Sequence, residues 1–243
     1  LRFGGGIAKF GEMSLLDSQV SANSAGENGG GVFNTLTLAR TDTTISENSA
    51  TLAGGGVGNT GSSLLIDRCT LSGNQATQNG GGIVNSNVLM IANSTLSGNS
   101  ATSSGGGIRN ESVMTMQHVT ASGNTAMAGS AIGNAGVIMS MSGSVVDGEC
   151  AGMAVGSSGH NTESPGDTCG LEQMSDGSGI SASGLGLAPL GDNGGATETH
   201  ALMGGSAALD RIPPGDCEVD EDQRGVARPQ GDQCDVGAFE LEP

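Results

Sequence analysis

The chain has 243 residues, a formal net charge of −17 and 45 glycines. It has no Trp or Tyr and only four Phe, which excludes a globule built around an aromatic core. The chain has 25 acidic residues and only 8 basic ones. We therefore expect no binding to nucleic acid or anionic membranes, which require clustered Lys and Arg.

A repeat of about 25 residues begins close to the N-terminus. Its first motif is Gly-Gly-Gly followed by an aliphatic residue, with a degenerate sixth copy; the copies occupy 4–7, 29–32, 54–57, 80–83, 105–108 and 129–132. A second motif, Ser-x-Asn-x-Ala, keeps the same interval, and an apolar run separates the two motifs. The Gly triplets and the abundant Ser, Thr and Asn exclude helical repeats, so the pattern predicts three short strands per period.

None of these strands has enough apolar surface to form a core alone. Stacking equivalent strands about 4.8 Å apart pairs each backbone amide with the next coil and closes a continuous core. The predicted fold class is all-β, a right-handed parallel β-helix. We assign residues 1–149 to the repeat array and residues 150–243 to a region that continues and caps the solenoid with irregular, disulfide-pinned coils.

Asparagines recur in two columns with the same period. We expect them to turn inward, satisfy turn amides and bond to the Asn above and below, as a scaffold rather than a ligand site. The columns are Asn34, Asn59, Asn85, Asn110 and Asn134, and Asn23, Asn48, Asn74, Asn99 and Asn124.

The five cysteines indicate an oxidising compartment. Cys69 lies in a predicted strand, where we expect a buried thiol. The other four are closely spaced in two pairs, which favours the local disulfides Cys150–Cys169 and Cys217–Cys234, although four cysteines allow three pairings. Metal binding is the rival interpretation, but no CxxC motif or nearby histidine supports it.

One candidate catalytic stripe lies in the array. Its residues are Asp17, Asp42 and Asp67, with Arg40 and Arg68 nearby. A Ca²⁺-dependent polysaccharide lyase or a glycoside hydrolase would need carboxylates of this kind on one face. The column then changes to Asn93 and His118, and no aromatic platform exists to stack sugars, so a solvated charge ladder is favoured.

The remaining candidates for chemistry are histidines and an acidic loop. The histidines are dispersed and define no Ser-His-Asp triad, so we predict no catalytic residues; they are His118, His160 and His200. Asp216, Asp220 and Asp222 could hold Ca²⁺ between the last two cysteines, but an exposed loop is favoured. We therefore predict no cofactor, with Ca²⁺ as the alternative.

Two parts of the chain resemble known families. Gly-Gly-Gly-Val-Phe-Asn at 29–34 and Ser-Gly-Asn-Ser-Ala at 97–101 resemble repeats of polymorphic outer-membrane adhesins. A longer resemblance, to the choice-of-anchor Q domain, is carried by 185–203, 205–210, 222–225 and 234–240. The resemblance implies a β-helix on the bacterial cell surface and implies no reaction.

The Asp-Gln-Arg-Gly motif at 222–225 predicts a buried clamp. Arg224 is expected to be clamped by carboxylates, with Asp210, Asp222 and Asp235 as the candidate partners.

These features predict a secreted, non-catalytic stalk, adhesin or filament subunit. No apolar run could cross a bilayer, so we expect no membrane insertion of this segment. The sequence starts at Leu1 without an initiator Met or signal peptide, which we interpret as a piece of a longer protein. Because the array begins at once, we expect end-to-end association with a preceding part of the polypeptide or with another subunit.

The alternative is a polysaccharide-binding or lyase-like module. Its groove would follow the second strands of the coils and carry Asp42, Asp67, Arg40 and Arg68, with surface glycans as partners.

Overall fold

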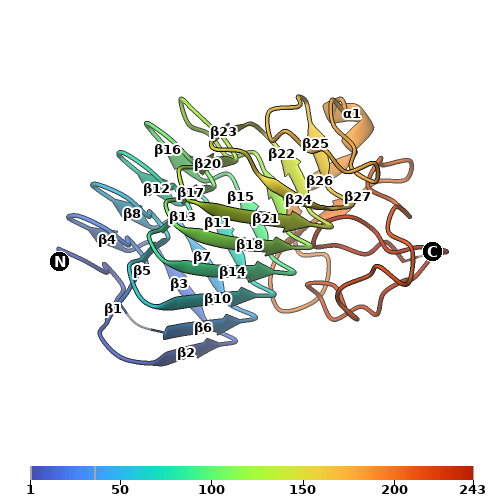
Figure 1. The fold of residues 1–243 in the computed structure, drawn as a ribbon. Helices are drawn as coiled ribbons and strands as arrows, with labels where there is room; N and C mark the ends of the chain where they lie inside the picture. Colours follow the sequence, from blue (N-terminus) through green and yellow to red (C-terminus); the bar gives the residue numbers. More distant parts are fainter. Residues whose placement is uncertain (1, 36, 243) are drawn as a thin grey trace.

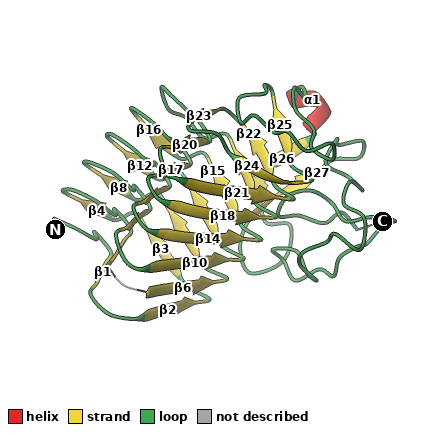
Figure 2. Cartoon of the chain, viewed as in Figure 1, coloured by secondary structure: helices red, strands yellow, loops and turns green. Residues whose placement is uncertain are grey.

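The computed structural model describes residues 2–35 and 37–242 as an all-β solenoid whose coils stack along one axis (Figure 1). The strands follow the solenoid, whereas the C-terminal region is mostly loop (Figure 2). The short α1 (Ala182–Leu185) is the one helix in the described ranges. The predicted parallel β-helix with a period of about 25 residues is confirmed.

Three seven-stranded parallel sheets run along the solenoid, one strand per coil in each. Sheet A comprises β1 (Ile7–Lys9), β5 (Val32–Asn34), β9 (Val57–Asn59), β13 (Ile83–Asn85), β17 (Ile108–Asn110), β20 (Ile132–Asn134) and β23 (Cys150–Gly152). Sheet B comprises β2 (Met13–Leu16), β6 (Thr37–Thr41), β10 (Ser63–Asp67), β14 (Val88–Ala92), β18 (Val113–Gln117), β21 (Ile138–Ser142) and β24 (Gly156–Gly159). Sheet C comprises β3 (Gln19–Ser21), β7 (Thr44–Ser46), β11 (Thr70–Ser72), β15 (Thr95–Ser97), β19 (Thr120–Ser122), β22 (Val145–Asp147) and β25 (Thr162–Ser164).

A fourth parallel ladder, sheet D, follows sheet C in four coils. Its strands are β4 (Ser24–Ala25), β8 (Ser49–Ala50), β12 (Gln75–Ala76) and β16 (Ser100–Ala101). The sequence predicts only three strands per coil, because a two-residue strand is too short to show an alternating pattern. Each alanine of sheet D is buried, so this ladder closes the coil beside the second Asn column.

The core lies between the sheets and is aliphatic. Leu64 and Ile66 point inward from β10 while Leu65 between them is exposed, as the two-residue period of a strand requires. Leu71 from sheet C and Ile83 from sheet A meet them, and all four inward side chains are fully buried.

The Gly triplets close each coil where backbones of neighbouring coils approach. Gly54 has a φ of +66°, a conformation that favours glycine. A Cβ on Gly55 would lie 2.4 Å from the carbonyl oxygens of Gln75 and Gly81 in the next coil. This position therefore requires glycine for space rather than for its φ angle.

After β25 the chain first covers the last coil. Gly177 forms a parallel bridge with Thr162, and Leu171 packs against the solenoid core. Cys169 is buried there in a disulfide with Cys150. Residues 165–181 thus form the end cover of the solenoid.

Most of the remaining chain lies along the side of the solenoid. The C-terminal flap, residues 187–240, contains the antiparallel hairpin of β26 (Leu187–Gly191) and β27 (Thr199–Leu202). It packs on the outer face of sheet C, to the right of the sheets in Figure 1. The sequence predicts that the whole of 150–243 continues and caps the solenoid. The flap instead lies against the side of the solenoid, and its contacts with sheet C join residues that are far apart in the sequence.

None of the helices in the described ranges is long and apolar enough to cross a bilayer.

Candidate functional site

The first Asn column forms an uninterrupted ladder inside sheet A. Nδ2 of Asn34 donates to Oδ1 of Asn59 at 2.8 Å, and Asn59 donates likewise to Asn85 at 2.8 Å. The chain continues from Asn85 to Asn110 at 2.8 Å and from Asn110 to Asn134 at 3.0 Å. All five side chains are buried, so their polar groups are matched to neighbouring coils rather than offered to a ligand.

The second column is bonded twice at every step. The backbone N–H and Nδ2 of Asn48 both donate to Oδ1 of Asn74, each at 3.0 Å. The same pair of bonds joins Asn23 to Asn48, Asn74 to Asn99 and Asn99 to Asn124. Every amide therefore has the same orientation, with its oxygen toward the first coil.

The candidate carboxylate stripe is interrupted after Asp42. The coil that leads to Arg68 is one residue longer, so Asp67 pairs with Thr41 and Arg68 takes the place above Asp42. Arg68 binds Asp42 bidentately, with Nε to Oδ1 at 2.9 Å and Nη2 to Oδ2 at 3.0 Å. The side chain of Arg40 lies outside the described part of the chain.

Burial raises the pKa of Asp67, an effect that the charge of Arg68 opposes. Arg68 is thus engaged with the carboxylates of Asp42 and Asp67.

An open cleft of about 770 Å³ lies between the first coils and the edge of the flap. Asp17, Asp42, Glu47 and Glu198 line it together with Ser and Thr hydroxyls. The cleft therefore offers carboxylate acceptors together with hydroxyl groups that can donate or accept hydrogen bonds.

The flap is attached to the solenoid through a column of threonines. The buried Gln223 donates from Nε2 to Thr70 Oγ1 at 2.9 Å and to Thr197 Oγ1 at 2.8 Å, and its Oε1 accepts from Thr95 at 2.7 Å. One coil further, Thr120 Oγ1 accepts from the backbone of the flap at 3.0 Å. The column is visible in the sequence, because a Thr precedes the Ser of Ser-x-Asn by two residues in successive repeats, but its contact with the flap is not.

His200 makes a further contact across this interface. Its Nε2 lies 2.9 Å from Ser97 Oγ and its Nδ1 lies 2.8 Å from the carbonyl oxygen of Ala188. Burial lowers the pKa of His200, while the Ala188 carbonyl and the charge of Asp147 oppose that shift. His200 is therefore a structural residue that joins the flap to sheet C.

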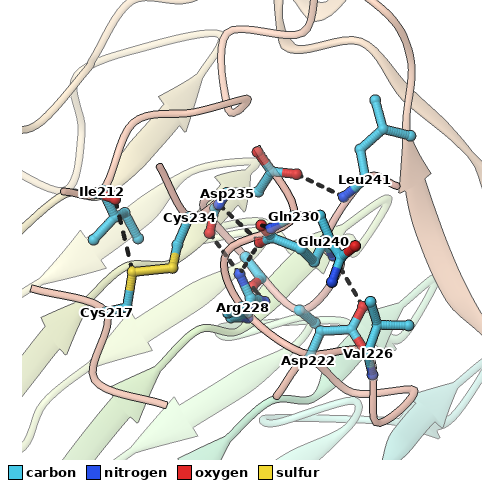
Figure 3. Close-up of polar contacts among 12 residues, drawn as sticks. Ile212, Cys217, Asp222, Val226, Arg228, Gln230, Cys234, Asp235, Glu240 and Leu241 are labelled. Carbon is cyan, nitrogen blue, oxygen red and sulfur yellow. Dashed lines mark hydrogen bonds and ion pairs between the residues drawn. A yellow bond between two sulfur atoms is a disulfide. The ribbon is translucent and has the colours of Figure 1, made fainter. Parts of the chain in front are cut away.

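Arg228 forms the most buried ion pair of the flap (Figure 3). Its Nη1 lies 2.9 Å from Glu240 Oε2, and both side chains are almost inaccessible. The guanidinium also donates to the carbonyl oxygens of Asp235 and Gly237, each at 2.7 Å. Burial raises the pKa of Glu240 and lowers that of Arg228, and the attraction between the two charges opposes both shifts.

Arg224 is clamped by one of its three predicted partners. Asp222 binds it at 2.8 Å, and its guanidinium lies 3.7 Å from the centre of the Phe239 ring. Asp235 instead accepts from the backbone N–H groups of Asp210 and Leu241. The sequence prediction did not include the more deeply buried Arg228.

A second cavity, of about 360 Å³, lies where the flap meets the last coils. His118, His160, Asp216 and Glu218 line it. Neither ring nitrogen of His118 has a hydrogen-bond partner among the described residues. Burial, reinforced by repulsion from Arg228, lowers the pKa of His118 to about 3, while the Gly237 backbone partly opposes the shift. Two histidines that are distant in the sequence therefore face one cavity.

The three acidic residues considered for Ca²⁺ do not meet. Asp222 is buried against Arg224, Asp216 faces His160 and Asp220 is exposed. Within residues 2–35 and 37–242, no three His, Cys, Asp or Glu side chains converge as a ready metal-binding set.

The cysteines form the two disulfides favoured by their spacing. Cys150 bonds to Cys169 and Cys217 bonds to Cys234. Cys69 is buried and belongs to neither disulfide, and its Sγ lies 3.1 Å from the carbonyl oxygen of Asp67.

Comparison of the chain with protein-family models, with curated proteins and with solved structures gives no match. The class of protein that the structure defines is therefore the β-solenoid alone, and the adhesin and choice-of-anchor Q resemblances remain sequence-based.

Proposed function

We propose that this protein is a non-catalytic structural or adhesive rod of the bacterial cell surface. The observation that carries the proposal is the pair of uninterrupted Asn ladders. They commit buried polar side chains of successive coils to bonds along the axis. Such an interior resists bending and separation of coils.

The proposed extracellular location is supported by the disulfides and the charge. Two disulfides in one chain are typical of oxidising compartments. The net charge of −17 favours solubility and disfavours adhesion to nucleic acid. Both properties agree with the surface location implied by the sequence resemblance.

We further propose that the rod associates end to end through its first coil. Ile7, Met13 and Leu15 pack against the core but are only partly buried, unlike the inward residues of the following coils. The outer edges of β1, β2, β3 and β4 have no neighbouring strand within the described residues. A further β-helix coil would cover both the apolar side chains and these edges.

Negative-stain electron microscopy and light scattering over a range of concentrations test this proposal. We expect particles longer than one rod, one β-helix wide, and we expect Leu15→Lys to reduce them to single rods. Leu65→Lys is the matched control, because Leu65 points outward from the middle of sheet B. Single rods for the unchanged protein at every concentration would contradict end-to-end association.

A second candidate function, glycan binding, is favoured by the acidic cleft beside the first coils. Its carboxylates and hydroxyls could accept hydrogen bonds from sugar hydroxyls, without an aromatic platform. A glycan array probed with the native protein and with Asp17→Asn tests it, since Asp17 lines the cleft and is exposed. Retention that is equal for both proteins, or absent, would remove this candidate.

A further inference from the structure

We propose that the cavity between the flap and the last coils binds a zinc-class divalent cation through His118, His160 and Asp216. This inference does not depend on the proposed surface function, because it concerns one cavity and one class of ion.

The two histidines belong to one column of the solenoid. His118, Gly143 and His160 all have positive φ. The backbone N–H of His118 donates to the carbonyl oxygen of Ser142, just before Gly143. The N–H of Gly143 donates in turn to the carbonyl oxygen of Gly159, just before His160. The ring of His118 lies over Gly143, where a Cβ would be only 3.0 Å from Cε1 and Nε2. Glycine at this step therefore leaves room for His118 to reach toward the coil of His160.

The tautomer of His160 is set by the flap. Nδ1 lies 3.2 Å from the carbonyl oxygen of Arg211, and a carbonyl only accepts, so Nδ1 carries the hydrogen. In the neutral ring, Nε2 then has a lone pair, which faces Oδ2 of Asp216 at 3.4 Å. Two electron-pair donors at this separation match the edge of a tetrahedral zinc site, about 3.3 Å for bonds near 2.0–2.1 Å.

His118 supplies the third donor. His118 is 1% exposed and lines the same cavity, and neither of its ring nitrogens makes a hydrogen bond of normal geometry with a described residue. The three groups do not yet converge on one point. The side chain of Asp216 is 61% exposed, so it can turn toward an ion between the two histidines without breaking a buried contact.

The donor chemistry selects the ion. Imidazole nitrogens suit Zn²⁺ and its transition-metal neighbours, whereas Ca²⁺ takes six to eight oxygen ligands. Glu218 is engaged with Ser142 and with Gln117, so it orients the loop rather than completing an oxygen cage. A bound ion would join the flap residue Asp216 to two coils of the solenoid.

Calorimetric titration of the intact, oxidised chain with ZnCl₂ at pH 7.5 tests the proposal. We expect one site, weakened at least about tenfold by His160→Gln and by Asp216→Asn. Asp220→Asn is the matched control, because Asp220 is an exposed acid of the same loop that does not line the cavity, and we expect unchanged affinity. CoCl₂ should give the visible absorption of tetrahedral Co²⁺ in the native chain and lose it in both variants.

Several results would overturn the proposal. They are zinc affinity equal in the native chain and both variants, displacement of zinc by equimolar Ca²⁺, or loss of affinity in Asp220→Asn as large as in Asp216→Asn. His118→Asn would disturb a buried residue, so His160→Gln and Asp216→Asn decide the outcome. Electron microscopy of rods tests the surface function separately, so the failure of one proposal is distinguishable from the failure of the other.

Discussion

A single asparagine of the ladder controls the bonding of three coils. Asn74 accepts two bonds from Asn48 and donates to Oδ1 of Asn99 and to the carbonyl oxygen of Ile45. We expect Asn74→Ala to lower the free energy of unfolding by about 2–4 kcal/mol, because buried donors and acceptors lose their partners. Denaturant unfolding followed by circular dichroism measures the change.

The neighbouring residue provides the control for this prediction. Gln75 begins β12 directly after Asn74 and is exposed, so Gln75→Ala should change stability by no more than about 0.5 kcal/mol. Equal effects of the two substitutions would show that the ladder contributes nothing beyond the strand itself.

The pKa of His200 predicts a pH dependence. Its pKa in the folded protein is below the ordinary value, so between the two values the unfolded chain binds a proton that the folded chain does not. The contribution of His200 to the free energy of unfolding is therefore complete above about pH 6.5, and it is lost as the pH falls below that value. His200→Gln should flatten the dependence of the unfolding free energy between pH 7.5 and pH 5, and an unchanged slope would contradict this prediction.

At the scale of elements, the Gly triplet sets how closely coils approach. Gly55→Ala would place a methyl group 2.4 Å from two backbone oxygens. We expect it to destabilise the solenoid by at least about 1–3 kcal/mol, since the coils must separate locally. Gly204→Ala has open space and no positive φ, so thermal denaturation should show almost no change for that variant.

The strands were predictable because an apolar run recurs at the same place in successive repeats, as Leu64, Leu65 and Ile66 illustrate in one coil. The position of Arg68 above Asp42 was not, because an extra residue in one coil shifts the register without changing the motif. The cavity that joins His118 to His160 was also hidden from the sequence, since it is created by stacking and by the flap.

For the whole molecule, the main difference from expectation is the lateral flap. The flap residues are joined to sheet C by side chains such as Gln223 and to one another by Arg228 and Glu240. The contacts with sheet C connect segments more than a hundred residues apart, and nothing in the local sequence of 187–240 distinguishes a lateral position from a terminal cap.

The two disulfides should therefore stabilise different parts of the molecule. Removing Cys217–Cys234 by double Ala substitution should destabilise the flap by about 2–4 kcal/mol and leave the coils intact. Hydrogen exchange should rise in residues 187–240 and not in β10 or β14. Removing Cys150–Cys169 should instead loosen the end cover, and the same exchange pattern in both variants would contradict this division.

The common orientation of the buried amides gives the rod an electrical direction. Each column is a row of aligned dipoles, with the amide oxygens toward the first coil and the amide nitrogens toward the other end. Dipoles arranged head to tail polarise one another, so an added coil strengthens those already present. A coil that meets Asn23 with a nitrogen extends the row, whereas an inverted coil opposes oxygen to oxygen. The arrangement of its side chains thus lets the rod distinguish the direction of its neighbour.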